Sequence, residues 1–202
     1  MTTQLPGTVT IGHPSNHPAR TRKTTPKIPL NFLGIPFGLA GLGEAWTTAA
    51  DYHHAPHVVG EIILVLSAAV WAVVVGAYVL HATRDRGAIV KDLLDPIAAP
   101  FASLALITPM ILAGAGLFPH AETAGRTVAD VFIGLTVLLG GWFTGQWIYG
   151  PLELDKLHPG YFLPTVAGGL IAAVSAASVE QRRLAEVMFG LCLLYTSDAA
   201  DE

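Results

Sequence analysis

Three carboxylates inside or beside long apolar stretches are the residues whose type and position could do chemistry. Glu44, Glu61 and Asp130 each stand among aliphatic, aromatic or small neighbours. An ionisable group at membrane depth is costly, and it often serves as a proton or ion site. The alternative is that each lies at the end of a membrane span, where water reaches it. Glu44 and Asp130 are our candidates for a proton or ion site.

Three of the histidines, His53, His54 and His57, form a cluster in the sequence, which could bind zinc or respond to pH. No cysteine or other reinforcing ligand accompanies them, and loop histidines are usually just solvated. A haem site would need histidines at matching depths on two facing helices, and the apolar stretches contain no such pair. The sequence therefore predicts no metal site and no cofactor.

Hydrolytic chemistry in a membrane would need a nucleophile with a partner base, or paired carboxylates, at one depth. The serines within the apolar stretches, Ser103, Ser175 and Ser178, have no candidate base in the same stretch. We therefore predict that the protein is not an enzyme.

The elements that must position these residues are membrane-spanning helices. The chain is 52% hydrophobic and 13% charged, and four uncharged windows are long enough to cross a bilayer: Ile62 to Leu80, Ile97 to Phe118, Val131 to Tyr149 and Tyr161 to Val179. A fifth, from Leu30 to about Ala50, is broken only by Glu44. A soluble bundle would alternate apolar and polar faces, and these windows have no polar face. The predicted fold class is an all-α integral membrane protein with spans at about 30–50, 58–82, 96–118, 127–149 and 161–179, and the start of a sixth at 182–191.

Basic residues predict the orientation. Residues 1–27 are rich in Thr, Pro and His, carry four basic residues, and are expected to form a disordered cytoplasmic tail. With the N-terminus inside, eight basic residues are cytoplasmic and three are outside, as the positive-inside rule favours. Arg182 and Arg183 count against this orientation. We expect a multi-pass protein of the cell membrane with a cytoplasmic N-terminus.

Prolines divide the predicted spans into two kinds. The first, third and fifth spans contain Pro36, Pro100 with Pro109, and Pro164, whereas the second and fourth have no internal proline. A proline frees a backbone carbonyl, which a membrane tolerates only where protein or water satisfies it. The odd spans also carry small residues at helical spacing, which lets helices approach closely or leaves room for a pore. We predict kinked odd helices inside and straight even helices outside.

Several motifs occur in an order typical of one membrane family. Residues 160–167 read GYFLPTVA, span one carries Phe32, Gly34, Gly38, Gly41 and Trp46, and span three runs from Asp95 and Pro96 through Phe101, Ser103 and Leu104 to Pro109. Together they resemble the tellurite-resistance and dicarboxylate transporter family, to which the plant slow-type anion channels are related. The resemblance implies ten helices in five hairpins, odd helices around a pore, and a trimer. It also implies a gating phenylalanine on a ninth helix, beyond this chain, which matches the N-terminal half only.

The last eleven residues, CLLYTSDAADE, differ from what precedes them and resemble the translation of a transposon-end sequencing adapter. We expect residues 192–202 to be an adapter-derived artefact and the natural frame to continue past Leu191, leaving 28–191 as a partial transmembrane domain. Without this tail the formal charge changes from −4 to −1, and no cysteine remains.

The predicted function is transport of small anions, with dicarboxylate or tellurite-type oxyanions as candidates, through a pore of kinked odd helices. The expected partners are small anions, the lipid bilayer and further copies of the chain, with no nucleic acid. This fragment alone is expected to be inactive. The alternative is a proton-coupled secondary transporter that uses Glu44 or Asp130. The residues predicted to line the pore are Gly34, Gly38, Ser103, Pro109, Pro164, Thr165 and Gly168.

Overall fold

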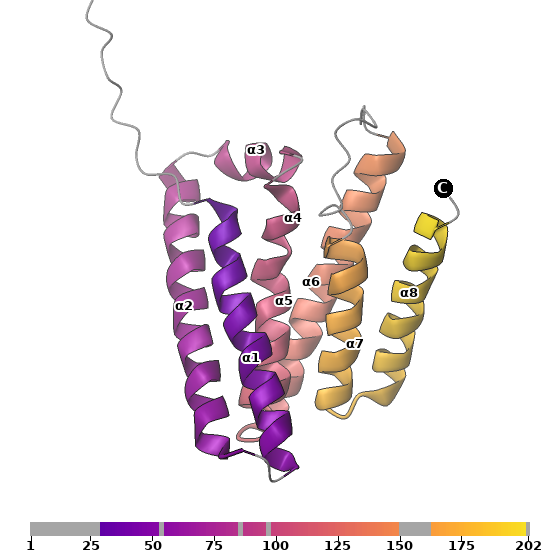
Figure 1. The fold of residues 1–202 in the computed structure, drawn as a ribbon. Coiled ribbons are helices and arrows are strands. Elements are labelled where there is room, and N and C mark those ends of the chain that lie inside the picture. Colours follow the sequence, from indigo (N-terminus) through magenta and orange to yellow (C-terminus); the bar gives the residue numbers. More distant parts are fainter. Residues whose placement is uncertain (1–28, 53–54, 85–86, 96–97, 150–162, 201–202) are drawn as a thin grey trace, which may run out of the picture.

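The computed structural model describes residues 29–52, 55–84, 87–95, 98–149 and 163–200, and every regular element in these ranges is helical. Most of the helices lie side by side along one direction, and α3 crosses one end of the bundle (Figure 1). In chain order the elements are η1 (Leu30–Leu33), α1 (Gly34–Asp51), α2 (His57–Arg84), α3 (Ala88–Leu94), α4 (Ala99–Ala102), α5 (Leu104–Ile111), η2 (Leu112–Leu117), α6 (Glu122–Tyr149), η5 (Leu163–Ala167), α7 (Gly168–Ser178) and α8 (Arg182–Ala200).

Glycines set the close approach of α1 and α2, the first helical hairpin. A Cβ at Gly60 of α2 would stand 2.6 Å from Cγ2 of Thr47, and one at Gly43 of α1 would stand 2.8 Å from the Leu64 side chain. Small residues at a helix interface let two backbones approach closely in a membrane. The hairpin therefore depends on glycine at the two crossing positions.

The segment Ala99–Leu117, formed by α4, α5 and η2, lies in the middle of the bundle. In the most apolar stretch of this segment, 56% is buried inside the protein. The corresponding share is 17% for His57–Arg84 and 28% for Glu122–Gln146. This order agrees with the prediction that the proline-bearing third span lies inside and the straight second and fourth spans lie outside. Helix α1 is more exposed than that prediction requires, with Ile35 and Leu42 about half exposed.

Three helices in the described part of the chain are long and apolar enough to cross a membrane: His57–Arg84, Ala99–Leu117 and Glu122–Gln146. Thr165–Ser178 is a shorter apolar helix. Helix α1 carries Glu44 and Asp51 in its second half, which lowers its hydropathy. Membrane crossing by the first and fifth predicted spans therefore stays a prediction.

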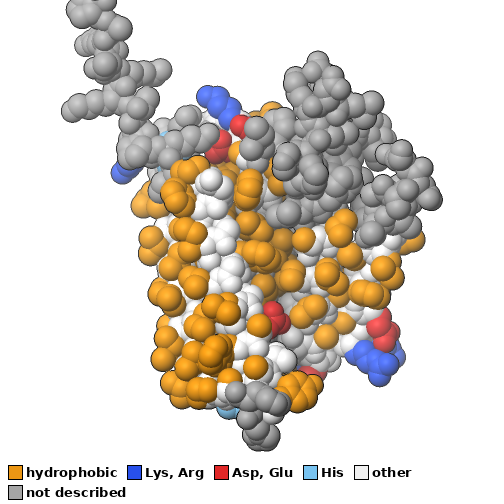
Figure 2. Space-filling model, in the orientation of Figure 1, with side chains coloured by type: hydrophobic (Ala, Val, Ile, Leu, Met, Phe, Trp, Pro, Cys, Tyr) orange, Lys and Arg blue, Asp and Glu red, His pale blue; other side chains and the backbone are white. Residues whose placement is uncertain are grey.

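The outer faces of α2 and α6 are apolar, as a lipid-facing surface requires. Hydrophobic side chains cover most of the coloured surface in Figure 2, and charged ones gather mainly towards its ends. The large hydrophobic residues exposed on the two helices are Val58, Ile62, Val65, Leu66, Val73, Val79 and Leu80 on α2, and Val131, Leu135, Val137, Leu138 and Trp142 on α6.

Candidate functional site

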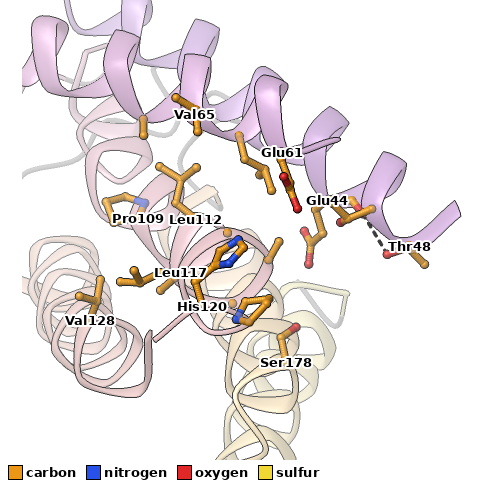
Figure 3. Close-up of a pocket in the computed structure, with 18 of the residues that line it drawn as sticks. Glu44, Thr48, Glu61, Val65, Pro109, Leu112, Leu117, His120, Val128 and Ser178 are labelled. Atoms are coloured by element: carbon orange, nitrogen blue, oxygen red, sulfur yellow. Dashed lines mark hydrogen bonds between the residues drawn. The ribbon is translucent and has the colours of Figure 1, made fainter. Parts of the chain in front are cut away.

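A cavity of about 830 Å³ lies between α1, α2, the Ala99–Leu117 segment, α6 and the end of α7. Its lining includes residues from the end of α1 and the start of α2, which meet at one end of the bundle (Figure 1), and Figure 3 shows it in close-up. Residues from five separate elements line it, so the cavity exists only because the helices pack as they do. We take it as the candidate site.

One wall of the cavity is acidic. Glu44 and Asp51 of α1 and Glu61 of α2 line it, and Figure 3 shows the Glu44 and Glu61 carboxylates directed into the same space. His57 and His120 are also lining residues, and Nδ1 of His57 lies 3.8 Å from Oδ1 of Asp51. The described lining includes no lysine or arginine. Apart from the two imidazoles, the ionisable side chains of this lining are therefore acidic.

Another part of the cavity wall is apolar. Trp71 of α2 and Phe132 of α6 meet edge to face, with ring centroids 6.2 Å apart and planes at 83°. Such an arrangement places the positive edge of one ring against the negative face of the other. Leu112, Leu117 and Val128 continue this wall. The cavity thus combines a carboxylate wall with an aromatic and aliphatic one.

A proline kink forms the boundary between the cavity and the core. Pro109 lies inside α5 and is a lining residue of the cavity. Because proline has no N–H, the carbonyl of Ala105, four residues earlier, loses its helical donor. The indole Nε1–H of Trp71 donates to this carbonyl oxygen at 3.0 Å. An outer helix therefore satisfies the backbone group that the kink frees.

The backbone stays widened after the kink. Residues Leu112–Leu117 form a π-helical turn, in which the Phe118 N–H donates to the Ala113 carbonyl five residues earlier at 2.9 Å. Just before this turn, the Met110 carbonyl accepts a hydrogen bond from the Ser175 hydroxyl of α7 at 2.8 Å. Alanine and glycine residues of the π turn line the cavity. Wide backbone geometry of this kind is frequent at functional sites.

The other prolines behave differently from the sequence prediction. Pro36 lies in the first turn of α1, where its missing N–H has no intrahelical acceptor to lose. Pro100 likewise lies in the first turn of α4. The Pro36 carbonyl accepts a hydrogen bond from the buried Ser67 hydroxyl at 2.7 Å, which ties α1 to α2. Within the described helix interiors, the kink is therefore at Pro109.

The structure brings Glu44 and Pro109 together at the cavity and places the other predicted residues elsewhere. Ser103, Thr165 and Gly168 are buried in packing between helices, and the Ser103 hydroxyl donates to the Pro100 carbonyl. Gly34 and Gly38 have open space where a Cβ would stand. The side chain of Pro164 lies outside the described residues. A pore-lining role for all seven stays a prediction.

Asp130, the second candidate proton site, does not reach the cavity. It lies exposed on α6, where Oδ2 accepts a hydrogen bond from Nε2 of Gln181 in the α7–α8 turn at 3.1 Å. Arg126, one helical turn earlier, donates to the Val179 carbonyl and pairs with Glu180. Asp130 thus belongs to a polar attachment between α6 and that turn.

Sequence reasoning missed Trp71 and the π turn as parts of the site. A signal was present, because Pro109 predicts an unpartnered carbonyl at Ala105 and Trp71 is an indole donor in the neighbouring span. Their pairing depends on the rotation of α2 against α5, which the sequence pattern does not state. Of the predicted histidine cluster, His57 lines the cavity, and His53 and His54 lie outside the described residues.

The chain is similar to known proteins over the region that forms these helices. Residues 27–197 match the family model described as voltage-dependent anion channel. The tellurite resistance protein TehA homolog of Haemophilus influenzae is 26% identical over 174 residues, which cover 81% of this chain and 50% of the relative. The chain therefore spans about half the length of the curated relative that it matches.

Proposed function

The chain belongs to the voltage-dependent anion channel family and is a membrane protein, and from this premise we propose that it forms one half of a pathway for small anions. The resemblance to the tellurite-resistance and dicarboxylate transporter family is confirmed by the family match and by the Haemophilus relative. This is a family of channels and transporters rather than enzymes, as predicted. The proposed activity is the passage of small anions across the membrane, with no covalent bond made or broken.

The widened backbone beside the cavity is the observation that carries the proposal. In a membrane, irregular backbone is tolerated where it is buried in protein or lines a water-filled space. Here Pro109 and the π turn line a cavity, and side chains from α2 and α7 satisfy the carbonyls of Ala105 and Met110. A helix that needed only to span the bilayer would not require these supports.

The acidic wall makes the cavity an entrance rather than an anion-binding site. Glu44, Asp51 and Glu61 repel an approaching anion, and this repulsion is greatest at low ionic strength. We propose that selectivity resides deeper, along the predicted small-residue positions, with dicarboxylates or tellurite-type oxyanions as candidate ions. The carboxylates then set the rate at which anions arrive.

Completion of the pathway is also part of the proposal. Because the chain spans half of its relative, we propose that further helices close the pore, that the complete protein is a trimer with its N-terminus in the cytoplasm, and that the 202-residue chain alone does not conduct. The first test is an independent long read of the locus through the codon after Leu191. A frame that continues with further proline-bearing spans supports the proposal, and a stop codon there contradicts it.

The second test compares the two lengths of chain. Each is reconstituted into liposomes that contain a halide-sensitive dye, and chloride and nitrate influx are measured against potassium leak. The complete protein should admit anions and the 202-residue chain should not. Equal anion flux through both chains would contradict the proposed need for a second half, and cation flux through the complete protein would contradict the anion pathway itself.

A second candidate function is proton-coupled secondary transport through Glu44. It is favoured by the direction of the Glu44 carboxylate, which points into the cavity, whereas Asp130 is hydrogen-bonded to Gln181 outside it (Figure 3). In the complete protein, Glu44→Gln should abolish uptake driven by a pH gradient if this mechanism operates. The matched control is Asp130→Asn, which should leave uptake unchanged. Anion current that persists in Glu44→Gln without any pH-gradient dependence excludes the coupled mechanism.

A further inference from the structure

Helix α3, Ala88–Leu94, crosses the end of the bundle instead of running along it (Figure 1). It follows α2 and precedes the Ala99–Leu117 segment, two of the helices long enough to cross a membrane. A helix placed across the end of such spans lies at the level of the lipid headgroups. Its position therefore corresponds to the membrane surface.

One face of α3 is attached to the bundle. Asp92 is 2% exposed, and its Oδ2 accepts a hydrogen bond from the Tyr78 hydroxyl of α2 at 3.2 Å. Leu93 and Ile89 lie over a small apolar cavity of about 140 Å³. Beyond the helix, Oδ1 of Asp95 accepts a hydrogen bond from the Ala98 N–H at 3.2 Å. Both described carboxylates of this segment thus have partners within the protein.

The other face of α3 is apolar and basic. Val90 and Leu94 are each 57% exposed. Val79 and Leu80, near the end of α2, are exposed as well. Lys91 of α3 and Arg84 at the end of α2 are also exposed. Apolar side chains beside outward-facing cations are typical of a helix that lies in an anionic membrane surface.

More basic residues precede α1 in the sequence. Helix α1 begins at the end of the bundle where α2 finishes (Figure 1), and the sequence before it carries Arg20, Arg22, Lys23 and Lys27. Clusters of basic residues next to membrane spans attract anionic lipids, with about fivefold stronger attraction for each residue near the surface. A protein partner of this end would need acidic groups of its own, whereas the bilayer is already present.

We infer that α3 is an interfacial helix that binds anionic phospholipid headgroups at this end of the bundle, with Val90 and Leu94 in the acyl boundary and Lys91 and Arg84 on the phosphates. The inference depends on membrane insertion and not on anion transport. Loss of transport activity would therefore leave it intact, and its failure would leave the proposed pathway intact.

Lipid selectivity tests the basic side chains. The 202-residue chain, in neutral detergent, is titrated with phosphatidylglycerol or phosphatidylcholine, and bound lipid is counted by native mass spectrometry. Phosphatidylglycerol should be preferred, and Arg84→Gln with Lys91→Gln should lower that preference by about tenfold or more. The matched control, Arg182→Gln with Arg183→Gln at the opposite end of the bundle, should keep it. Absence of a preference in the unmodified chain, or equal loss in both double variants, would overturn the inference.

Depth tests the apolar side chains independently of charge. Val90→Cys in a Cys192→Ser background is labelled with bimane, and the chain is reconstituted into vesicles of phosphatidylcholine with phosphatidylglycerol. Doxyl groups near the lipid glycerol should quench the label, and aqueous iodide should not. Quenching by iodide alone would show that α3 stands in water and is free for a protein partner, which would overturn the inference. An unchanged circular dichroism melt confirms that the labelled variant is folded.

Discussion

Replacement of Trp71 by phenylalanine should destabilise the bundle, and the loss should disappear when Pro109 is replaced by alanine. Trp71 donates through Nε1 to the Ala105 carbonyl, the group that Pro109 leaves without a helical donor. Phenylalanine keeps an aromatic ring beside Phe132 but has no N–H. In a Pro109→Ala background, residue 109 regains its N–H and can donate to Ala105. The indole is then no longer needed.

The expected loss of unfolding free energy follows from the hydrogen bond that the Ala105 carbonyl loses. An unsatisfied buried carbonyl costs about 1–3 kcal/mol in soluble proteins. Interhelical hydrogen bonds measured inside a membrane protein average about 0.6 kcal/mol and reach about 1.7 kcal/mol. Ala105 is partly buried and the Trp71 bond is 3.0 Å long. We expect Trp71→Phe to cost about 1 kcal/mol alone and close to zero with Pro109→Ala, giving a coupling energy of about 1 kcal/mol.

The assay is reversible unfolding of the 202-residue chain in mixed micelles, in which the mole fraction of sodium dodecyl sulfate is raised and helicity is followed by circular dichroism. The four members of the cycle are compared under identical conditions. Trp142→Phe serves as the control, because Trp142 is 50% exposed on the outer face of α6, and it should change stability little. Additive single-variant effects, with no coupling, would refute the assignment of Trp71 to the proline carbonyl.

Three further predictions test other parts of the structure. Gly125→Ala should destabilise the start of α6, because a Cβ at residue 125 would stand 2.7 Å from Cα of Phe118 in the turn before this helix. Gly134→Ala on the same helix meets open space and serves as the control. Thermal melts in detergent should show a lower melting temperature for the first variant only. Arg126→Gln should lower stability by about 1 kcal/mol and speed amide exchange in the α7–α8 turn, which the guanidinium joins to α6; unchanged exchange would contradict this. Glu44→Gln with Glu61→Gln should raise anion influx through the complete protein. An ion at the centre of an 830 Å³ cavity is roughly 6 Å from each carboxylate, so one charge contributes about 0.7 kcal/mol, or about threefold, at low salt. The gain should shrink at 0.15 M salt, and a salt-independent gain would mean that screening by solution does not reach the cavity.

Much of the helical layout followed from local features of the sequence. The uncharged windows and their length predicted α2, the Ala99–Leu117 segment and α6, because a bilayer or a buried bundle selects for unbroken apolar helices. The lack of proline in α2 and α6 predicted their outer position, since their backbones need no outside partner. The motifs from Phe32 to Pro164 also predicted the family, because the order of glycines and prolines along the chain is itself sequence information.

The composition of the cavity depended on contacts between distant elements. Glu44 and Asp130 read alike as carboxylates in apolar surroundings, yet only Glu44 faces the cavity, because the rotation of each helix decides what its side chains meet. Pro36 and Pro109 also read alike, but the start of α1 at Gly34 makes the first harmless.

Sequence by itself therefore determined where the helices run, that they belong to a membrane, and which of them carry a helix-breaking residue. Tertiary structure alone decided which neighbour bonds these carbonyls, as Trp71 does for Ala105 and Ser175 does for Met110. The physical reason is the distance along the chain over which each property is set. Helix formation and apolar length are properties of residues a few positions apart, whereas a hydrogen bond between two helices depends on their mutual rotation and depth, which only the packed bundle fixes.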